Sequence, residues 1–422
     1  MASNGGMVLV IKAPRGTHDI LPSEMEKWHY VEEVARKVAS DYGYKEIRTP
    51  IFEHTELFSR GIGDTTDIVE KEMYTFKDKG GRSITLRPEG TASIVRAIGE
   101  HKLYGKGKLQ KLFMIGPMFR YERPQSGRYR QFWQLDFEAI GSSDPYLDVE
   151  IIALSVEIFS RLGLKGLSVE LNSVGCPKCR PKYKELLKDY LRPYFDDLCE
   201  SCQSRFDRNV LRILDCKNEG CRRITESAPR MVDYLCEECS WHFEEVKKGL
   251  NSLGIPYKIN HRLVRGLDYY TKTAYEVISG ELGAQNAVCG GGRYDGLSED
   301  IGGPSIPGVG FAAGVERIVL TMEQQEVAFP RSRGMEYFVV VLDSRYKEFA
   351  ARVVYELRHR GIYADMDYFG RSLKAQMRYA DTMGARKVVF VGQEEVDSGM
   401  AKVKDMQTGE QVEVEWGKIG NE

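Results

Sequence analysis

The chain has no hydrophobic run long enough to cross a membrane. Its longest apolar runs, such as Phe338 to Leu342, are far shorter than the roughly 20 residues that a transmembrane helix needs. The N-terminus has no basic region followed by an apolar stretch and a cleavage site, so no secretory signal is predicted. Charge of either sign is not in excess, with 60 Lys and Arg against 62 Asp and Glu. These absences exclude a membrane-spanning protein and one that is basic throughout, and they predict a cytoplasmic location.

Cysteine is almost absent outside one 64-residue stretch, which holds eight of the nine cysteines, and only Cys289 lies elsewhere. Without a secretory signal, bound metal or free thiols are favoured over disulfides. The spacing is typical of one or two four-thiolate zinc sites. In chain order it reads Cys176-x2-Cys179-x19-Cys199-x2-Cys202 and then Cys216-x4-Cys221-x14-Cys236-x2-Cys239. No histidine lies near Cys289 in the sequence, so Cys289 is predicted to be a buried thiol rather than a nucleophile.

The known phosphate-binding glycine motifs are also missing. There is no Walker A sequence, and the glycines of 308–317 have the wrong spacing for a dinucleotide fingerprint. If the ligand is a nucleotide, arginines must therefore hold its phosphates. The segment 119–138 supplies them, with four arginines and one glutamate between Phe119 and Arg130. The alternative for this segment is a solvated basic hairpin.

Strand alternation in 130–140 places Phe132, Gln134, Asp136 and Glu138 on one face, which predicts the floor of a polar pocket. Three further segments present polar groups beside glycines. In 87–91, an acid and a hydroxyl suit a substrate ammonium, although the same pattern is also that of a helix N-terminus. In 263–270 and 289–296, the glycines of the second segment permit close approach of the backbone to a ligand, although each segment taken singly could be a turn.

The 422 residues predict several domains. We expect a first block at 1–174, a helical cysteine-rich insertion at 175–255, a second block at 256–328, a linker at 329–334 and a small α/β domain at 335–422. The insertion is predicted because its sequence is charged and helical in pattern, and β-rich sequence resumes at Tyr257. The last domain is predicted from alternating strand and helix patterns.

Together these segments resemble the class II aminoacyl-tRNA synthetases, and within them the histidyl-tRNA synthetase family. The resemblance runs from about Lys12 to the end. Segments 43–50, 119–138 and 308–320 resemble motifs 1, 2 and 3, of which motif 1 lies at the dimer interface of that family. Segments 265–270 and 291–297 resemble its histidine-specific signatures. The fold implied is α+β: an antiparallel-sheet catalytic core with a helical insertion, plus a C-terminal α/β anticodon-binding domain.

The resemblance also implies roles for individual residues. Arg120, Arg265 and Arg317 would be catalytic, with Arg120 and Arg317 on the ATP phosphates and Arg265 bridging the histidine carboxylate and the α-phosphate. Glu122 and Phe132 would contact adenine. The histidine ammonium would be bound by Glu89, Thr91 and Gln134, with Arg120 also among the histidine-binding residues. The imidazole would be surrounded by Glu138, Tyr269, Tyr270 and Tyr294. Arg123 and Gln125 would contact the tRNA acceptor end.

Further expectations concern partners and metals. Arg371, Lys374 and Arg378 recur at helical spacing in the last domain, so the resemblance assigns them to tRNA, whereas the pattern alone favours a solvated helix face. ATP, histidine, tRNA and a second copy of the chain are the implied partners, and Mg²⁺ would accompany ATP, with ligands that the sequence does not identify. The insertion of the family generally folds without metal, which argues against zinc.

Two other functions are weighed. A regulatory subunit of ATP phosphoribosyltransferase shares the core and binds histidine without activating it, but it usually lacks the last domain and much of the catalytic set. A nucleic-acid-binding module built on zinc ribbons would leave the polar pocket unexplained.

Overall fold

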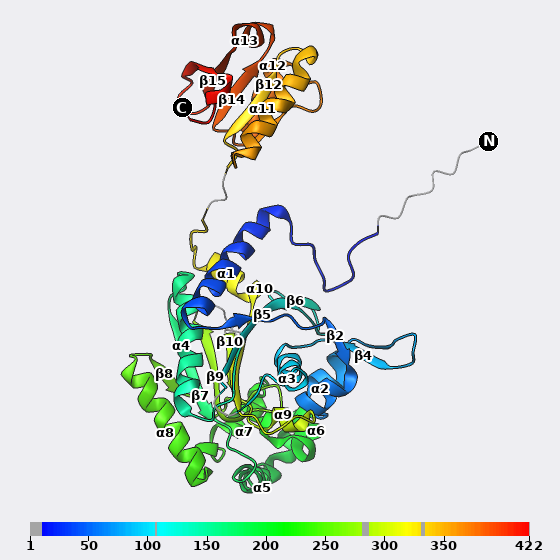
Figure 1. Cartoon of the computed structure of the whole chain (residues 1–422). Helices are drawn as coiled ribbons and strands as arrows, with labels where there is room; N and C mark the ends of the chain where they lie inside the picture. The colour runs from blue at the N-terminus through cyan, green and yellow to red at the C-terminus, as the bar shows by residue number, and fades with distance from the viewer. Residues whose placement is uncertain (1–10, 106–107, 281–286, 331–333, 422) are drawn as a thin grey trace, which may run out of the picture. The chain divides into compact units, whose positions relative to one another are not determined.

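The computed structural model describes residues 11–105, 108–280, 287–330 and 334–421 (Figure 1). The chain divides into two compact units, Met1–Phe329 and Pro330–Glu422. The segment 1–6 and half of the expected linker, residues 331–333, lie outside the described residues. In the described part of the chain, no helix combines the length and the apolar composition needed to cross a membrane.

The first unit is built on an eight-stranded sheet of order β1-β5-β6-β11-β10-β9-β7-β8. The inner pairs are antiparallel, and only the edge strands β1 and β8 pair in parallel with their neighbours. The strands are β1 (Lys45–Glu46), β5 (Gln110–Phe119), β6 (Gln131–Ile140), β7 (Leu167–Ser173), β8 (Tyr257–Ile259), β9 (Thr271–Ser279), β10 (Ala287–Arg293) and β11 (Gly308–Gly314). The antiparallel core expected from the sequence is therefore confirmed.

One face of this sheet carries the hydrophobic core. Phe113, Phe137 and Phe311 are register partners on β5, β6 and β11, and their rings stack with centroids 5.4 and 5.1 Å apart. Helices α1 (Pro22–Asp41), α4 (Pro145–Arg161) and α10 (Val315–Gln324) cover this face with their apolar sides. Because side chains alternate along a strand, the residues directly before and after each of these phenylalanines point to the opposite face of the sheet.

The opposite face is flanked by a small sheet of order β2-β4-β3 and by three helices. These elements are β2 (Phe52–His54), β3 (Thr75–Lys77), β4 (Ser83–Leu86), α2 (Thr55–Ile62), α3 (Thr91–Glu100) and α9 (Leu297–Asp300). Helix α3 begins directly after the turn Pro88-Glu89-Gly90. The polar residues of β6 and the start of α3 consequently lie on the same side of the sheet.

Residues 174–256 lie between β7 and β8, which are neighbours in the sheet, and they are entirely helical or irregular (Figure 1). The helices are α5 (Arg180–Leu191), α6 (Glu200–Arg208), α7 (Glu219–Glu226) and α8 (Glu237–Ser252), with short 3-10 helices at Arg192–Asp197, Val210–Ile213 and Met231–Tyr234. Helix α8 packs on α4. This segment is therefore an insertion that leaves and rejoins the same edge of the sheet.

The second unit has a five-stranded sheet of order β13-β12-β14-β15-β16. Its elements are β12 (Tyr337–Val341), α11 (Lys347–His359), β13 (Ala364–Met366), α12 (Leu373–Thr382), β14 (Lys387–Val391), α13 (Gln393–Ser398), β15 (Met400–Asp405) and β16 (Gln411–Glu415). Strands β12, β13 and β14 are parallel, as the alternating pattern predicts, and the antiparallel pair β15–β16 extends the sheet.

Candidate active site

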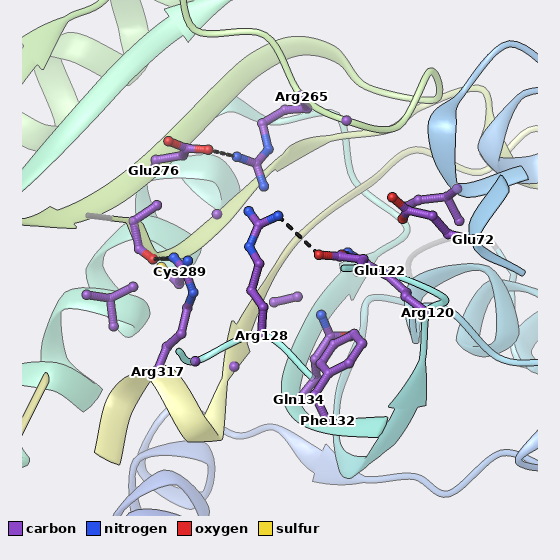
Figure 2. Close-up of a pocket in the computed structure, with 18 of the residues that line it drawn as sticks. Glu72, Arg120, Glu122, Arg128, Phe132, Gln134, Arg265, Glu276, Cys289 and Arg317 are labelled. Atoms are coloured by element: carbon purple, nitrogen blue, oxygen red, sulfur yellow. Dashed lines mark hydrogen bonds and ion pairs between the residues drawn. The ribbon is translucent and has the colours of Figure 1, made fainter. Parts of the chain in front are cut away.

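A cavity of about 410 Å³ opens on the polar side of the large sheet, between the β5–β6 hairpin and strands β9 to β11 (Figure 2). Eleven charged side chains line it. The basic ones are Arg120, Arg128, Arg212, Arg265 and Arg317, and the acidic ones are Asp67, Glu72, Glu122, Asp215, Glu276 and Glu316. Five guanidinium groups around one cavity of this size favour an anionic ligand such as a polyphosphate.

On one side of the cavity, arginines surround Glu122. The Nε of Arg120 donates to the carbonyl of Pro88 at 2.8 Å, and its Nη1 lies 3.8 Å from a Glu122 oxygen. Arg128 donates to the other Glu122 oxygen at 3.1 Å. The Arg120 guanidinium also lies 5.2 Å from the Phe132 ring centroid. Glu122, Arg120 and Phe132 therefore meet at one wall of the cavity, and Arg128 is an additional member.

On the other side, Arg265 forms an ion pair with Glu276 of β9 (Figure 2). Burial alone would lower the pKa of Arg265, but the Glu276 carboxylate outweighs it and raises that pKa, so Arg265 is a permanent cation. The guanidinium lies against the backbone of Gly290, where an added Cβ would come within 2.3 Å of Nη2. Arg317, in the first turn of α10, donates to the carbonyl of Ala287 at 2.5 Å.

Cys289 also lines the cavity, but burial raises the pKa of its thiol to about 12. A thiol with this pKa stays protonated near neutral pH and is a poor nucleophile. The expected buried thiol is thus consistent with the environment of Cys289.

Beneath the cavity lies a buried polar cluster centred on Glu138. The hydroxyl of Thr91 donates to one Glu138 oxygen at 2.6 Å, and the hydroxyl of Tyr294 donates to the other. Gly310 is the register partner of Glu138 on β11, and a Cβ at position 310 would lie 1.8 Å from the carboxylate. Glycine at this position is therefore required for Glu138 to occupy the cluster.

Glu89 joins the same cluster through α3. Its carboxylate accepts the backbone N–H groups of Thr91 and Ala92 at 2.8 and 2.9 Å, and the Tyr269 hydroxyl lies 3.4 Å away. Glu89 thus accepts hydrogen bonds from backbone N–H groups that have no partner within the helix, which agrees with the prediction of a helix N-terminus in 87–91. Its carboxylate also lies inside the polar cluster. The rings of Tyr269 and Tyr270 lie 4.7 Å apart, with Tyr294 5.8 Å from Tyr269.

Asp136 is the buried group to which sequence reasoning gave no role, although the alternation of β6 placed it on this face. It is fully buried, and among the described residues neither of its oxygens has a hydrogen-bond partner. Burial, reinforced by the charge of Glu89, raises the pKa of Asp136 to about 8. Gln134 likewise has an unpaired buried oxygen within the described ranges. Because unpaired buried acceptors are costly, the site suits a ligand that carries several N–H donors and positive charge.

Replacing Asp136 with asparagine should remove a pH dependence of stability in the ligand-free protein. Because the folded-state pKa of Asp136 is about 8, against 3.8 for an ordinary aspartate, the folded protein keeps a proton that the unfolded chain releases. Between these values, stability falls as pH rises, by up to about 1.4 kcal/mol per pH unit. Urea unfolding from about pH 5 to about pH 8 should show a shallower decline for Asp136→Asn. Equal slopes for the two proteins would contradict the assignment.

Other predicted site residues lie apart from the cavity. Arg123 and Gln125 are exposed in the β5–β6 loop and do not line it. In the second unit, Arg371 precedes α12, so the predicted helical stripe is wrong at this position. Arg371 bonds to Asp367 and lies over the rings of Phe369 and Tyr379. Only Lys374 and Arg378 lie on the helix itself, four residues apart and exposed.

Glu276, Arg212 and Asp215 were missed by the sequence analysis. Glu276 follows the same strand alternation that revealed the β6 face, so the pattern of β9 could have indicated it. Arg212 and Asp215 come from the insertion, and only the tertiary fold brings them to the cavity.

Comparisons with known proteins agree over the whole chain. Residues 16–318 match a family model described as histidyl-tRNA synthetase, and residues 336–422 match one described as anticodon binding domain. A histidine–tRNA ligase of Halothermothrix orenii is 57% identical over 404 residues, covering 96% of both chains. One of Desulforamulus reducens is 56% identical over 401 residues, 95% of this chain and 96% of the relative. The crystal structure of apo S. aureus histidyl-tRNA synthetase superposes with a TM-score of 0.82 at 42% identity, covering 97% of this chain and 98% of that chain.

Proposed function

Because the chain belongs to the histidyl-tRNA synthetase family, we propose that its arginine-lined cavity and the buried cluster beneath it activate histidine with ATP. The chain is an ATP-dependent ligase that joins histidine to tRNA. The main support for this site is that a positively charged cavity lies directly against a buried cluster of hydrogen-bond acceptors. Five guanidinium groups surround the cavity, and buried acceptors centred on Glu138 lie below it.

Histidine is assigned to the buried cluster. Glu89, Thr91 and Gln134 receive its ammonium, and Arg120 lies beside them. The unpaired oxygen of Gln134 supports this assignment, because an ammonium donates the hydrogen bonds that it lacks. Glu138, Tyr269, Tyr270 and Tyr294 surround the imidazole. Glu138 is already held by two hydroxyl groups, so its carboxylate is preorganised for an imidazole N–H.

ATP is assigned to the cavity. Phe132 stacks on adenine and Glu122 contacts its edge, while Arg120 and Arg317 hold the phosphates. Arg265 lies where the histidine carboxylate attacks the α-phosphorus. This attack forms a carboxyl–phosphate bond and breaks the bond from the α-phosphorus to pyrophosphate, so no protein nucleophile is needed. Catalysis then consists of positioning and charge stabilisation by three arginines.

Glu72 and Glu122 would hold the Mg²⁺ that accompanies ATP, and the ion would supply positive charge for the pyrophosphate leaving group. The donor set fits a hard cation, because the cavity contains two neighbouring carboxylates, Glu72 and Glu122 (Figure 2). Burial and then the charge of Glu122 raise the pKa of Glu72. A divalent cation bound by these carboxylates would offset that repulsion.

The tRNA is assigned to both units. Arg123 and Gln125 contact the acceptor end, because their loop is exposed beside the cavity that holds the adenylate. The second unit belongs to a family of anticodon-binding domains. There, Lys374 and Arg378 contact phosphates from one face of α12, and Arg371 contributes from the preceding loop with its guanidinium already oriented by Asp367.

The chain is proposed to act as a homodimer in the cytoplasm. Ile51, Phe52 and Phe76 are exposed apolar side chains in or next to the small sheet, and Ile51 directly follows the segment that resembles motif 1. A second copy would remove them from water. The cytoplasmic assignment rests on the tRNA and ATP substrates and on the nine free cysteines.

A regulatory histidine-binding subunit is disfavoured, because the anticodon-binding unit is matched over 336–422 and all three catalytic arginines are present. A module built on zinc ribbons is disfavoured by the polar cluster, which such a module does not need.

The proposal is tested by ATP–pyrophosphate exchange with each amino acid in turn, without tRNA. Exchange is expected with histidine alone. Histidine binding without exchange would contradict the activation step and favour the regulatory alternative. Light scattering on the same preparation should give the mass of two chains, and the mass of one chain would overturn the homodimer.

A further inference from the structure

We propose that the insertion holds two structural zinc ions, each bound by four cysteine thiolates in a nested arrangement. The outer site is formed by the first and last cysteine pairs of the insertion, Cys176, Cys179, Cys236 and Cys239. The inner site is formed by Cys199, Cys202, Cys216 and Cys221. In each set, the four Sγ atoms all lie within 4.8 Å of one another.

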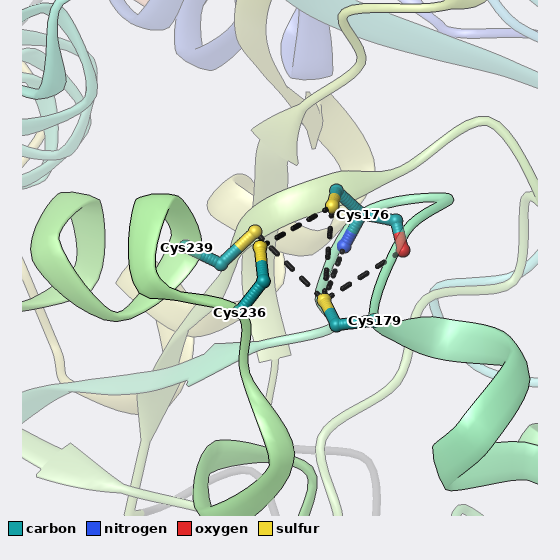
Figure 3. Close-up of side chains that lie close together, drawn as sticks. All are labelled: Cys176, Cys179, Cys236 and Cys239. Atoms are coloured by element: carbon teal, nitrogen blue, oxygen red, sulfur yellow. Dashed lines mark hydrogen bonds between the residues drawn. The ribbon is translucent and has the colours of Figure 1, made fainter.

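The outer set has the size of a tetrahedral zinc site. Its four sulfur atoms point toward a common centre (Figure 3). Sγ–Sγ distances are 3.7 Å for Cys176–Cys179, 3.8 Å for Cys176–Cys236 and 3.9 Å for Cys179–Cys239. Zinc–sulfur bonds of about 2.3 Å in a tetrahedron place the sulfur atoms about 3.8 Å apart. The Sγ–Sγ distances of the outer set therefore match those of a tetrahedral zinc site.

The inner set repeats this geometry. Cys199 and Cys216 have sulfur atoms 3.8 Å apart. The backbone N–H of Cys199 donates to the sulfur of Cys221 at 3.2 Å, and in the outer set the N–H of Cys176 donates to the sulfur of Cys179 at 3.2 Å. Such N–H···S bonds stabilise negative charge on sulfur, which is the form that binds metal.

Disulfides do not explain either set. A disulfide would bring two sulfur atoms to about 2.05 Å of each other. All nine cysteines are free, and the Sγ–Sγ distances for Cys176–Cys236 and Cys199–Cys216 are 3.8 Å. Four sulfur ligands in a tetrahedron are typical of zinc. Each Zn²⁺ would replace the protons of four thiols, which pass to solvent, and each site would then carry a net charge of −2.

Positive side chains are placed to offset that charge and to couple the sites to the rest of the unit. Arg180 follows Cys179 directly and donates to the carbonyls of Val174 and Gly175, and also to that of Tyr270 at 2.5 Å. Lys272 forms an ion pair with Glu238, which lies between Cys236 and Cys239, at 2.9 Å. The outer site is thus tied to the chain segment that carries Tyr269 and Tyr270.

The inner site lies next to a different part of the active-site cavity from the outer site. The segment between its two cysteine pairs carries Asn209, which donates to Asp268 at 2.9 Å, and Arg212, which lines the cavity. Arg262 donates to the carbonyls of Leu214 and Arg222, which flank Cys216 and Cys221, at 3.0 Å each. An ion at this site would fix the position of 209–215 over the cavity.

The cysteines make up a large part of the insertion's own core. The insertion consists of helices and 3-10 turns, and all eight of its cysteines are among its buried or half-buried core residues, together with residues such as Tyr183 and Phe206. Small segments with limited cores are commonly stabilised by metal ions. The zinc ions supply that stabilisation here.

The test is the metal content of the full-length protein purified without added metal. We expect two zinc ions per chain, and zinc K-edge absorption should give only sulfur neighbours at about 2.3 Å. Zinc below one ion per chain, nitrogen or oxygen neighbours, or iron in place of zinc would overturn the proposal. A single zinc ion per chain would overturn the two-site arrangement.

Variants assign the ions to the two sets. Cys239→Ser and Cys221→Ser should each contain one zinc ion per chain, and Cys289→Ser, the matched control outside both sets, should contain two. If Cys239→Ser and Cys221→Ser do not fold, Co²⁺ introduced into the unmodified protein gives a second measurement, since two tetrathiolate cobalt centres have characteristic visible absorption. Its absence would contradict the proposal. Metal content is measured independently of exchange activity, so the zinc proposal and the proposed function can fail separately.

Discussion

Replacing Arg265 with alanine should lower the rate of histidine-dependent ATP–pyrophosphate exchange by at least about 1,000-fold, because an arginine that stabilises charge in a phosphoryl-type transition state contributes about 10³ to 10⁵ in rate. Arg265 is ion-paired with Glu276 and lies against Gly290, so its guanidinium is held in one position before substrates bind. The effect should appear mainly in kcat, because the charge that Arg265 neutralises develops during the reaction.

Two controls separate catalysis from folding. Arg82→Ala removes an exposed guanidinium of the same unit that forms an ion pair with Asp78, so its exchange rate should be unchanged. Arg265→Lys keeps the charge without the planar fork and should recover part of the lost rate. Circular dichroism of Arg265→Ala should match that of the unmodified protein. An unfolded variant, or one with normal exchange, would remove Arg265 from the catalytic set.

The largest loss of stability is expected from Arg293, whose side chain is fully buried with that of Asp148. Its guanidinium donates to Asp148, to Asp295 at 3.0 Å and to the carbonyl of Ser142 at 2.9 Å. Arg293→Met should lower the free energy of unfolding by about 3–5 kcal/mol, because it leaves Asp148 charged and buried without its partner. Urea unfolding of the first unit measures this loss.

The double variant Arg293→Met, Asp148→Leu provides the decisive comparison. Removing both charges should recover much of the stability lost in the single variant, since buried ion pairs are often replaceable by apolar residues. The pH dependence has a defined sign. Burial alone would raise the pKa of Asp148, but the charge of Arg293 and the hydrogen bonds lower it. The stabilisation is therefore present above the ordinary aspartate range and is lost as pH falls through the lowered pKa. A double variant as unstable as the single one would contradict this account.

Local patterns in the sequence predicted much of the site, because strand alternation is visible along the chain. The period of two in β6 placed Gln134 and Glu138 on one face, and the structure has both there, beside the arginines of the same hairpin. The glycines of 289–296 were predicted to permit a close approach of the backbone to a ligand, and in the structure the Arg265 guanidinium lies against Gly290. Both patterns are visible within a few residues of the sequence.

Long-range pairings were not predictable in the same way. In chain order, the cysteines form a first and a second group of four, whereas the structure joins Cys176 and Cys179 with Cys236 and Cys239. The 56 residues 180–235 separate these two pairs. The pairing of Arg265 with Glu276 depends on how β9 meets the preceding loop. The buried state of Asp136 depends on Glu89 and α3, which come from a distant segment. Each of these contacts is set by tertiary packing.

The alternation of side chains along β6 also limits which insertions and deletions this strand can accept. Phe137 belongs to the aromatic stack of the core, and Glu138, the next residue, belongs to the polar cluster on the other face. Deleting one residue within the strand would shift every following side chain to the wrong face, so a carboxylate would enter the aromatic core and a phenyl ring would enter the pocket. The loop at 120–130 is not subject to this rule. A change of length in the loop therefore leaves the two faces of the strand intact, although it would displace cavity residues such as Arg128.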